Sequence, residues 1–167
     1  AAEYGFNERF SNKTAIAPTA SISIICGGAS PGVEPIAANS YTHKTLSGSY
    51  NVRNRYLEKI LKKYDKNNEE IWSSITTNQG SVSHLDFLTD LEKDVFKTAF
   101  ELDQKWIVEL GADRTSYISQ AQSINIFLPA DVHKKELHQI HFQAWKKGLK
   151  SLYYCRSKSI QRAENVN

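Results

Sequence analysis

Methionine is absent from all 167 residues, and the chain begins with Ala1. Because translation starts at methionine, we expect either a processed chain or a piece of a longer one, and we favour the piece. Cysteine occurs only at Cys26 and Cys155, without a CxxC spacing. This excludes a secreted disulfide scaffold. We expect a cytoplasmic, reducing environment and predict that both thiols are small buried hydrophobic groups.

Long apolar runs are also missing. No stretch reaches the ~18 apolar residues of a membrane span, and the first residues lack the charged and apolar regions of a signal peptide. The formal net charge is only +3, with basic residues spread along the chain. We therefore expect neither a membrane nor a nucleic acid as a partner. The hydrophobic fraction of 40% and the charged fraction of 23% are typical of a globular domain.

Helical periodicity is the most pronounced local pattern. Residues 54–64 and 69–75 favour two short helices. Thr89 and Glu92 have the spacing of a capping box at the start of a third helix. Apolar residues three or four apart predict that this third helix is long and amphipathic and that Gly111 terminates it. These apolar residues are Leu88, Leu91, Val95, Ala99, Leu102, Trp106 and Leu110.

Three short segments favour strands: residues 14–17, 123–128 and 149–154. A further helix is expected over residues 131–147. The order strand, long helix, strand, helix, strand indicates an α/β layer with parallel strands. Three short strands cannot bury both faces of a sheet with so few helices. We therefore expect the chain to complete a larger sheet or barrel, and to be poorly stable alone.

Histidines and tryptophans are candidates for a metal site and for the core. The histidines of the helix over 131–147 lack further ligands nearby in sequence, so we expect surface or interface positions and no metal site. These histidines are His133, His138 and His141. The tryptophans stand at helical spacing among apolar neighbours, which predicts core packing. They are Trp72, Trp106 and Trp145.

Residues 17–23 read Ala-Pro-Thr-Ala-Ser-Ile-Ser, a stretch of small and hydroxyl-bearing side chains. Small residues let the backbone approach a ligand, and hydroxyl and N–H groups can donate to a phosphate. The GxxxxGK[ST] pattern of a P-loop is absent. On chemistry alone, the favoured alternative is a turn whose hydroxyls bond their own backbone. The candidate ligand-binding residues are Pro18, Thr19, Ala20, Ser21 and Ile22.

Tyr153 and Tyr154 end the last apolar segment. Tyrosine can lose an electron and a proton together, so a pair in contact could pass on an oxidising equivalent. The alternative is two ordinary strand tyrosines, because aromatic residues favour strands. Neighbours on a regular strand also point to opposite faces, so stacking would require a bend or a strand end.

Three segments together resemble the large, catalytic subunit of class I ribonucleotide reductase. APTASISIICGGASPGVEPIAANSYTHKTLSGSY (17–50) resembles the substrate-phosphate loop of that family and the segment after it. VFKTAFELDQKWIVELGADRTSYISQAQSINIFLPAD (95–131) resembles a late helix and strand, and HFQAWKKGLKSLYYCRS (141–157) resembles the final barrel strand. The likeness covers nearly the whole chain in the family's order.

The resemblance implies that residues 1–155 are the C-terminal portion of a ten-stranded α/β barrel, incomplete in isolation, followed by a polar, mobile tail over 156–167. It implies that residues 18–22 hold the phosphates of a ribonucleoside diphosphate. It also implies that Tyr153 and Tyr154 form the dyad that carries a radical from the small subunit. A distorted strand end at the dyad is then expected.

The resemblance further implies that much of the enzyme lies elsewhere. The cysteine that becomes a thiyl radical, the disulfide-forming pair and the nucleotide sites should lie upstream, so this chain binds no cofactor and is inactive alone. The whole enzyme would use the small subunit's metal and radical cofactor, the effectors ATP and dNTPs, and a dithiol reductant. Its partners would be the N-terminal part of the large subunit, the small radical-generating subunit, and thioredoxin or glutaredoxin. The alternatives are a split gene, an inert truncated fragment, or a non-catalytic module that only binds partner subunits.

Overall fold

The chain divides into two compact units, each described here by itself. The computed structural model describes residues 2–5, 12–27, 29–46 and 48–157. Unit 1 comprises residues 1–23, 31–34 and 103–167, and unit 2 comprises residues 24–30 and 35–102. A short 3-10 helix, η1 (Ala2–Tyr4), lies near the start of the chain, and helix α1 (Ala20–Ile25) runs from unit 1 into unit 2.

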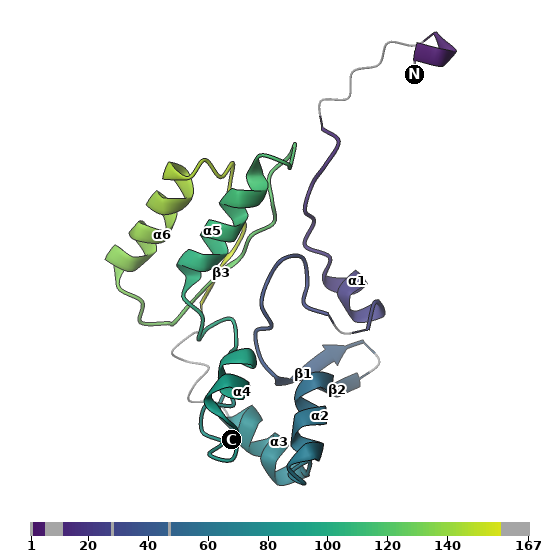
Figure 1. Cartoon of the computed structure of the whole chain (residues 1–167), viewed down its shortest axis with the longest axis vertical. Helices are drawn as coiled ribbons and strands as arrows, with labels where there is room; N and C mark the ends of the chain where they lie inside the picture. Colours follow the sequence, from purple (N-terminus) through teal and green to yellow (C-terminus); the bar gives the residue numbers. More distant parts are fainter. Residues whose placement is uncertain (1, 6–11, 28, 47, 158–167) are drawn as a thin grey trace. The chain divides into compact units, whose positions relative to one another are not determined.

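Unit 2 consists of a β-hairpin followed by helices. Strands β1 (Ser40–Thr45) and β2 (Gly48–Arg53) pair antiparallel, with Ser40 opposite Arg53. Helices α2 (Arg55–Lys63), α3 (Glu69–Thr77) and α4 (Asp90–Val95) follow (Figure 1). The sequence reasoning missed the hairpin, because its mostly polar strands lack the alternation of a half-buried strand.

The core of unit 2 is apolar and lies among its helices. Its buried residues are Leu57, Leu61, Trp72, Ile75, Val82, Leu85, Leu88 and Phe96. The amphipathic pattern over 54–64 correctly predicts α2, because Leu57 and Leu61 face this core one turn apart. Trp72 is 2% exposed, which confirms its predicted core position.

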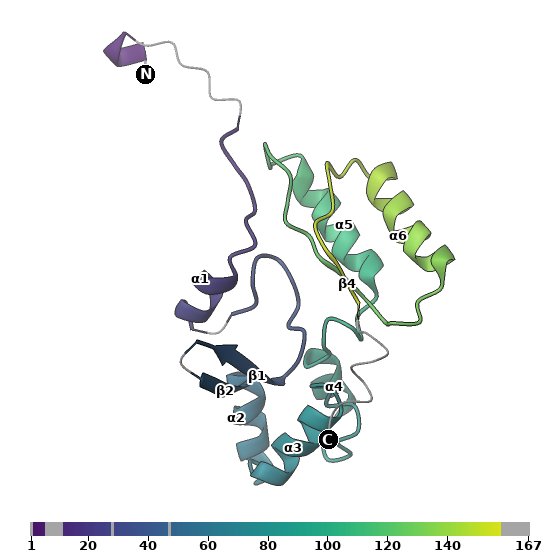
Figure 2. The ribbon, with the colours of Figure 1, turned by 180° about the vertical axis from the view of Figure 1, so that it is seen from behind.

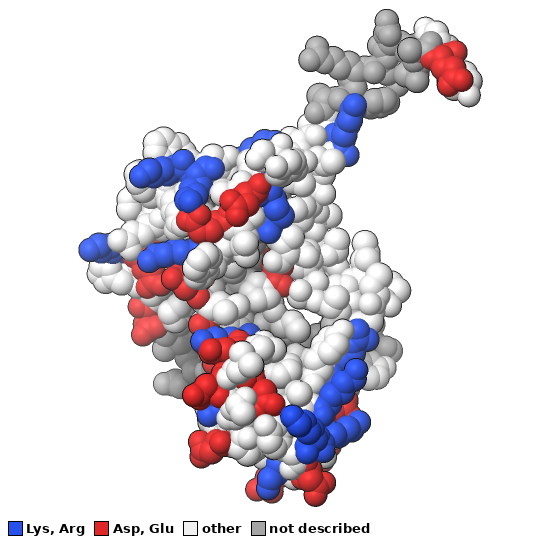
Figure 3. Space-filling model, viewed as in Figure 1, with Lys and Arg blue, Asp and Glu red and all other residues white. Residues whose placement is uncertain are grey.

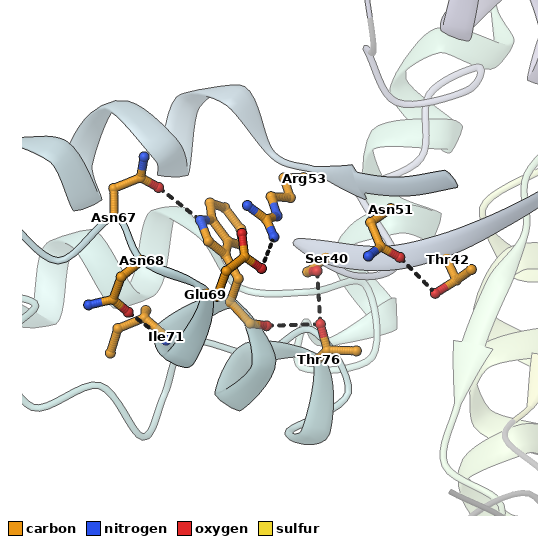
Figure 4. A network of polar contacts seen from close by, with 10 residues as sticks. Ser40, Thr42, Asn51, Arg53, Asn67, Asn68, Glu69, Ile71 and Thr76 are labelled. Atoms are coloured by element: carbon orange, nitrogen blue, oxygen red, sulfur yellow. Dashed lines mark hydrogen bonds and ion pairs between the residues drawn. The ribbon is translucent and has the colours of Figure 1, made fainter. Parts of the chain in front are cut away.

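Polar side chains tie the hairpin of unit 2 to its helices (Figure 4). The Ser40 hydroxyl on β1 lies 2.9 Å from the Thr76 hydroxyl on α3, which donates to the Trp72 carbonyl. Arg53 at the end of β2 reaches Glu69 at 2.6 Å. Because the Glu69 side chain is largely exposed, solvent weakens this ion pair, and the part-buried hydroxyl contacts are the stronger constraint on the geometry.

The prediction of one long helix over 88–110 is wrong. Helix α4 ends at Val95, and α5 (Gln104–Thr115) begins after a non-helical segment. Hydrogen bonds hold that segment: Ala99 donates its N–H to the Ile36 carbonyl, and the Thr98 hydroxyl and N–H donate to Glu101. The capping box of Thr89 and Glu92 is confirmed for α4.

The apolar stripe predicted over 88–110 is not one buried face. Leu88 belongs to the core of unit 2 and Ala99 is buried, whereas Leu91, Val95, Trp106 and Leu110 are exposed. The buried apolar side chains of α5 in unit 1 are instead Ile107 and Val108. Gly111 is not a terminal cap, because α5 continues to Thr115. A Cβ at Gly111 would lie 2.7 Å from the Ile124 side chain, so this glycine permits the helix to approach the strand segment closely.

Unit 1 contains a β–α–β arrangement against which helix α5 lies. Strand β3 (Ile126–Leu128) and strand β4 (Cys155–Ser157) pair in parallel and are joined through α6 (Lys134–Lys146). Helices α5 and α6 lie side by side in both views (Figures 1 and 2). The parallel α/β order predicted from the sequence is therefore confirmed, and the described residues alone do not close a barrel.

The predicted strands of unit 1 are shorter than expected or displaced. The segment over 14–17 makes a single parallel bridge, from Ile16 to Gln122. The last strand occupies 155–157 rather than 149–154, so the first two residues of the predicted tail, 156 and 157, lie in β4. The rest of that tail, residues 158–167, lies outside the described residues.

Several burial predictions fail. Cys26 and Cys155 are both exposed rather than buried. Trp106 is 67% exposed and Trp145 is 72% exposed, so neither packs into the core of this chain. Helical spacing identifies the face of a helix on which a side chain lies, but the face is buried only where another element covers it.

The predicted helix over 131–147 starts later, at Lys134. Its cap is His133, whose Nδ1 accepts the Lys135 N–H. His138 stacks against Phe142 with ring centroids 6.1 Å apart. Charged side chains of both signs are interspersed on the face shown in Figure 3.

Candidate functional site

Both sequence-predicted sites belong to unit 1, and one strand segment connects them. Ile16 pairs in parallel with Gln122, and the Ser123 N–H bonds to the Ile16 carbonyl at 3.0 Å. On the other side of the same segment, the Tyr153 N–H bonds to the Ile124 carbonyl at 2.8 Å. Ile16 and Tyr153 are therefore about two strand spacings, ~10 Å, apart.

The hydroxyl-rich loop follows Ile16 directly and leads into α1. Thr19 has a φ of 54°, a left-handed conformation that is unusual for a β-branched residue. Its hydroxyl oxygen accepts the Gly32 N–H at 2.7 Å, and its carbonyl accepts the Ser23 N–H at 2.9 Å. These two bonds hold the turn that starts α1 at Ala20.

The two serines of α1 differ in what their hydroxyls contact. Ser23 is 8% exposed, and its hydroxyl donates to the Ala20 carbonyl at 2.8 Å. Ser21 is exposed, as are Pro18, Ala20 and Ile22. In the first turn of any helix, the N–H groups have no carbonyl of their own helix to bond. An anion at this turn could accept from such N–H groups and from the Ser21 hydroxyl.

The rings of Tyr153 and Tyr154 contact one another in a tilted arrangement. Their ring centroids are 4.2 Å apart with an interplanar angle of 53°, and the rings are 50% and 55% exposed. A side-chain hydrogen bond with Tyr154 raises the pKa of Tyr153, and the charge of Tyr154 and burial raise it further, against the opposing charge of Arg156. The Tyr153 hydroxyl therefore keeps its proton at neutral pH.

A β-bulge makes this contact possible. The β3–β4 register pairs Ile126 with Cys155, and its regular continuation would bond the Tyr154 N–H to the Ile124 carbonyl. The Tyr153 N–H occupies that carbonyl instead, while the Tyr154 carbonyl still accepts the Ile126 N–H at 2.9 Å. Two residues therefore oppose Asn125 alone, which breaks the strict alternation of side chains. The distorted strand end expected at the tyrosines is confirmed.

Asn125 and Glu34 complete the surroundings of the pair, and sequence reasoning missed both. Asn125 is 3% exposed, and its Oδ1 accepts the Tyr154 N–H at 3.0 Å. Glu34 is 8% exposed and accepts hydrogen bonds from the backbone and side chain of Asn125. Burial raises the pKa of the Glu34 carboxyl, against the opposing effects of Arg156 and Asn125. The Arg156 guanidinium lies 5.5 Å from the centre of the Tyr154 ring.

In the part of the chain that the structure describes, no group of three or more His, Cys, Asp or Glu side chains is arranged so that it could hold a metal ion. Among the same residues, every helix is too short or too polar to traverse a lipid bilayer.

Comparisons with known proteins point to a single family. The family model described as "Ribonucleotide reductase, barrel domain" matches residues 2–155. The large subunit of ribonucleoside-diphosphate reductase from Invertebrate iridescent virus 6 is 52% identical over 167 residues, which is 98% of this chain and 17% of that protein. The large subunit from Danio rerio is 38% identical over 142 residues, 84% of this chain and 18% of that protein.

A solved structure, the alpha subunit of the Actinobacillus ureae class Id ribonucleotide reductase, matches with a TM-score of 0.77 at 44% identity. The match covers 86% of this chain and 26% of that one. The chain thus spans about a quarter or less of the length of these relatives. Two parallel strands with their helices are consistent with a partial barrel.

Proposed function

This chain belongs to the ribonucleotide reductase barrel family, and we propose that it supplies the substrate-phosphate loop and the radical-transfer tyrosines of a ribonucleoside-diphosphate reductase large subunit. The observation that carries the proposal is the contact between Tyr153 and Tyr154, with ring centroids 4.2 Å apart at a bulge. A regular strand would place the two rings on opposite faces. The bulge brings them together, and the buried Asn125 supports it.

The tyrosine pair can transfer a hydrogen-atom equivalent. When one tyrosine has lost an electron and a proton, it recovers both from the other across their shared hydrogen bond. The second ring is then left as a neutral phenoxyl radical, and no net charge develops. The proton to be transferred stays on the phenol at neutral pH, as for any tyrosine whose pKa is at or above its ordinary value.

The loop would act by orientation. Exposed Ser21 and the first turn of α1 offer donors for the diphosphate, and holding it places the ribose for attack. Upstream residues of the large subunit would supply the thiyl radical that abstracts the 3′ hydrogen. They would also supply the cysteine pair whose two electrons reduce the 2′ carbon as its hydroxyl leaves as water. We expect the small subunit to hold the metal and radical cofactor, ATP and dNTPs to act as effectors, and thioredoxin or glutaredoxin to renew the cysteine pair.

A hybrid large subunit tests the proposal. In this hybrid, residues 1–167 replace the matching segment of the iridescent-virus large subunit, which is 52% identical to them. The hybrid is combined with the small subunit of that virus and a dithiol, and conversion of CDP to dCDP is measured. Turnover supports the proposal. A folded hybrid that binds the small subunit without turnover would support a non-catalytic binding module instead.

Replacing Ser21 by alanine should raise the KM of the hybrid for CDP about ten-fold, because a hydrogen bond to a charged phosphate contributes about 1.5–3 kcal/mol. The kcat should change little, since the loss is one of binding rather than of radical transfer. Ser23→Ala is the matched control, because the Ser23 hydroxyl already donates to the Ala20 carbonyl. Equal KM values for the two variants would argue against phosphate binding by Ser21.

A further inference from the structure

The bulge at the tyrosines leaves one backbone donor that strand pairing does not satisfy. The Ile124 carbonyl is occupied by the Tyr153 N–H at 2.8 Å, so the Tyr154 N–H turns to Asn125 Oδ1 at 3.0 Å. This bond is partly buried, since Asn125 is 3% exposed and Tyr154 is 55% exposed. A partly buried N–H without a partner is destabilising, and the Asn125 amide supplies that partner.

The orientation of the Asn125 amide is set by Glu34. A carboxylate can only accept, so the Asn125 Nδ2 group must face Glu34 and its Oδ1 must face away. The Asn125 backbone N–H also donates to the Glu34 carboxylate, which is 8% exposed. Glu34 thereby directs the Asn125 oxygen toward the Tyr154 N–H and holds the backbone of Asn125 as well.

The segment that carries Glu34 is itself anchored in unit 1. The Glu34 N–H bonds to the Pro31 carbonyl at 3.1 Å, and the Gly32 N–H bonds to the Thr19 hydroxyl at 2.7 Å. Gly32 has a φ of +56°, and a Cβ there would lie 3.3 Å from the Ala17 carbonyl oxygen. A tight turn therefore presents the carboxylate to Asn125 from a fixed position.

We propose that Asn125 and Glu34 are positioning residues for the tyrosine pair: they hold the bulge that keeps the Tyr153 and Tyr154 rings in contact. This inference rests on the proposed radical-transfer function. Without the Asn125 amide, the strand gains by returning to regular pairing, in which Tyr154 bonds to Ile124. Regular pairing sends the two rings to opposite faces, which breaks their contact.

The test uses the hybrid large subunit with its small subunit and a dithiol. Asn125→Ala and Glu34→Ala should each lower kcat for CDP reduction about ten-fold or more, while KM and the Kd for the small subunit stay within about two-fold. Glu34→Gln should recover most of kcat, since its carbonyl oxygen still accepts a hydrogen bond from Asn125. A change in KM alone, or no recovery with glutamine, would contradict the positioning role.

Gln104→Ala is the matched control for a purely structural effect. Gln104 is 4% exposed, and its Oε1 accepts the Phe127 N–H at 2.8 Å, so this variant removes a similar bond from the same strand. It should cost comparable thermal stability but leave kcat unchanged. An equal fall in kcat for Gln104→Ala would overturn the inference, as would unchanged kcat for Asn125→Ala. If Asn125→Ala does not fold, the kcat values of Glu34→Ala and Glu34→Gln test the positioning role: equal values would contradict it.

Tyr154→Phe separates failure of this inference from failure of the proposed function. If Tyr154→Phe keeps its turnover, radical transfer through the pair is wrong and the positioning role fails with it. If Tyr154→Phe is inactive while Asn125→Ala and Glu34→Ala both keep the full kcat, only the positioning role is wrong.

Discussion

Replacing Tyr154 by phenylalanine will abolish CDP reduction by the hybrid large subunit. Phenylalanine keeps the ring that contacts Tyr153 but removes the hydroxyl, and with it the proton that must move with the electron. Loss of an obligatory relay should raise the barrier by more than about 4 kcal/mol, a fall in turnover of about a thousand-fold or more. The measurement is dCDP formed per enzyme over a long incubation.

The fold should tolerate Tyr154→Phe. Tyr154 is 55% exposed, so its hydroxyl is not a buried group whose loss leaves a cavity. Phenylalanine also keeps the ring that contacts Tyr153. Binding of CDP and of the small subunit should therefore match the parent protein.

Tyr117→Phe is the control for Tyr154→Phe. Tyr117 belongs to the same unit and is 81% exposed, so the same hydroxyl is removed outside the pair. Turnover should be unchanged. Retention of more than about a tenth of the turnover by Tyr154→Phe would show that the oxidising equivalent does not pass through this hydroxyl.

The second large expected effect is a loss of folding stability on substitution of Gly80 in unit 2. Gly80→Ala should destabilise the protein by about 3 kcal/mol or more, from left-handed backbone strain together with overpacking. Gly80 has a φ of +84°, and a Cβ there would lie 2.4 Å from the Ala38 Cβ and 2.9 Å from the Asn39 nitrogen. Neither atom belongs to a flexible side-chain end, so the backbone must move.

Movement at Gly80 also disturbs a buried hydrogen-bond network around Asn39. Its carbonyl accepts the Asn39 backbone N–H at 3.1 Å and the Asn39 side-chain amide at 2.9 Å. That amide also donates to the Phe96 carbonyl, and its oxygen accepts from the Asn54 amide. The substitution therefore weakens the connection between the hairpin and the helices of unit 2.

Gly148→Ala is the control that introduces backbone strain without a steric clash. The difference between the two variants therefore measures the clash at Gly80. Gly148 has a φ of +79°, similar to that of Gly80, but nothing lies within 4 Å of a Cβ built there. Only the conformational strain of about 1–2 kcal/mol should remain. Thermal unfolding of the hybrid should show a markedly larger fall in Tm for Gly80→Ala. Equal falls would mean that backbone strain, rather than the contact with Ala38, accounts for the loss.

The family and the local elements follow from the sequence by itself. Three segments in the family's order were enough to identify the reductase, and the family model covers residues 2–155. Helix α2 and the capping box of α4 were also predictable. Their determinants lie within a few residues of each other: Leu57 with Leu61, and Thr89 with Glu92. Such signals survive in a single sequence because no distant partner is needed.

The tertiary structure decided where those patterns end and which faces are covered. The apolar period over 88–110 runs through a break at 96–103, and its members Leu91, Val95, Trp106 and Leu110 are exposed rather than buried. Trp106, Trp145 and Cys155 stand at positions that favour burial, yet all three are exposed. Burial depends on elements brought close by the fold, which periodicity along one helix or strand does not contain.

The tyrosine site shows the same division. The sequence supplied Tyr153 and Tyr154 through resemblance, while regular strand geometry predicted rings on opposite faces. Their contact depends on a one-residue bulge, held by Asn125 and, through it, by Glu34, 91 residues earlier in the chain. A bulge of this kind is stabilised by hydrogen bonds between residues far apart in sequence. Only the folded chain could therefore decide that two adjacent tyrosines meet.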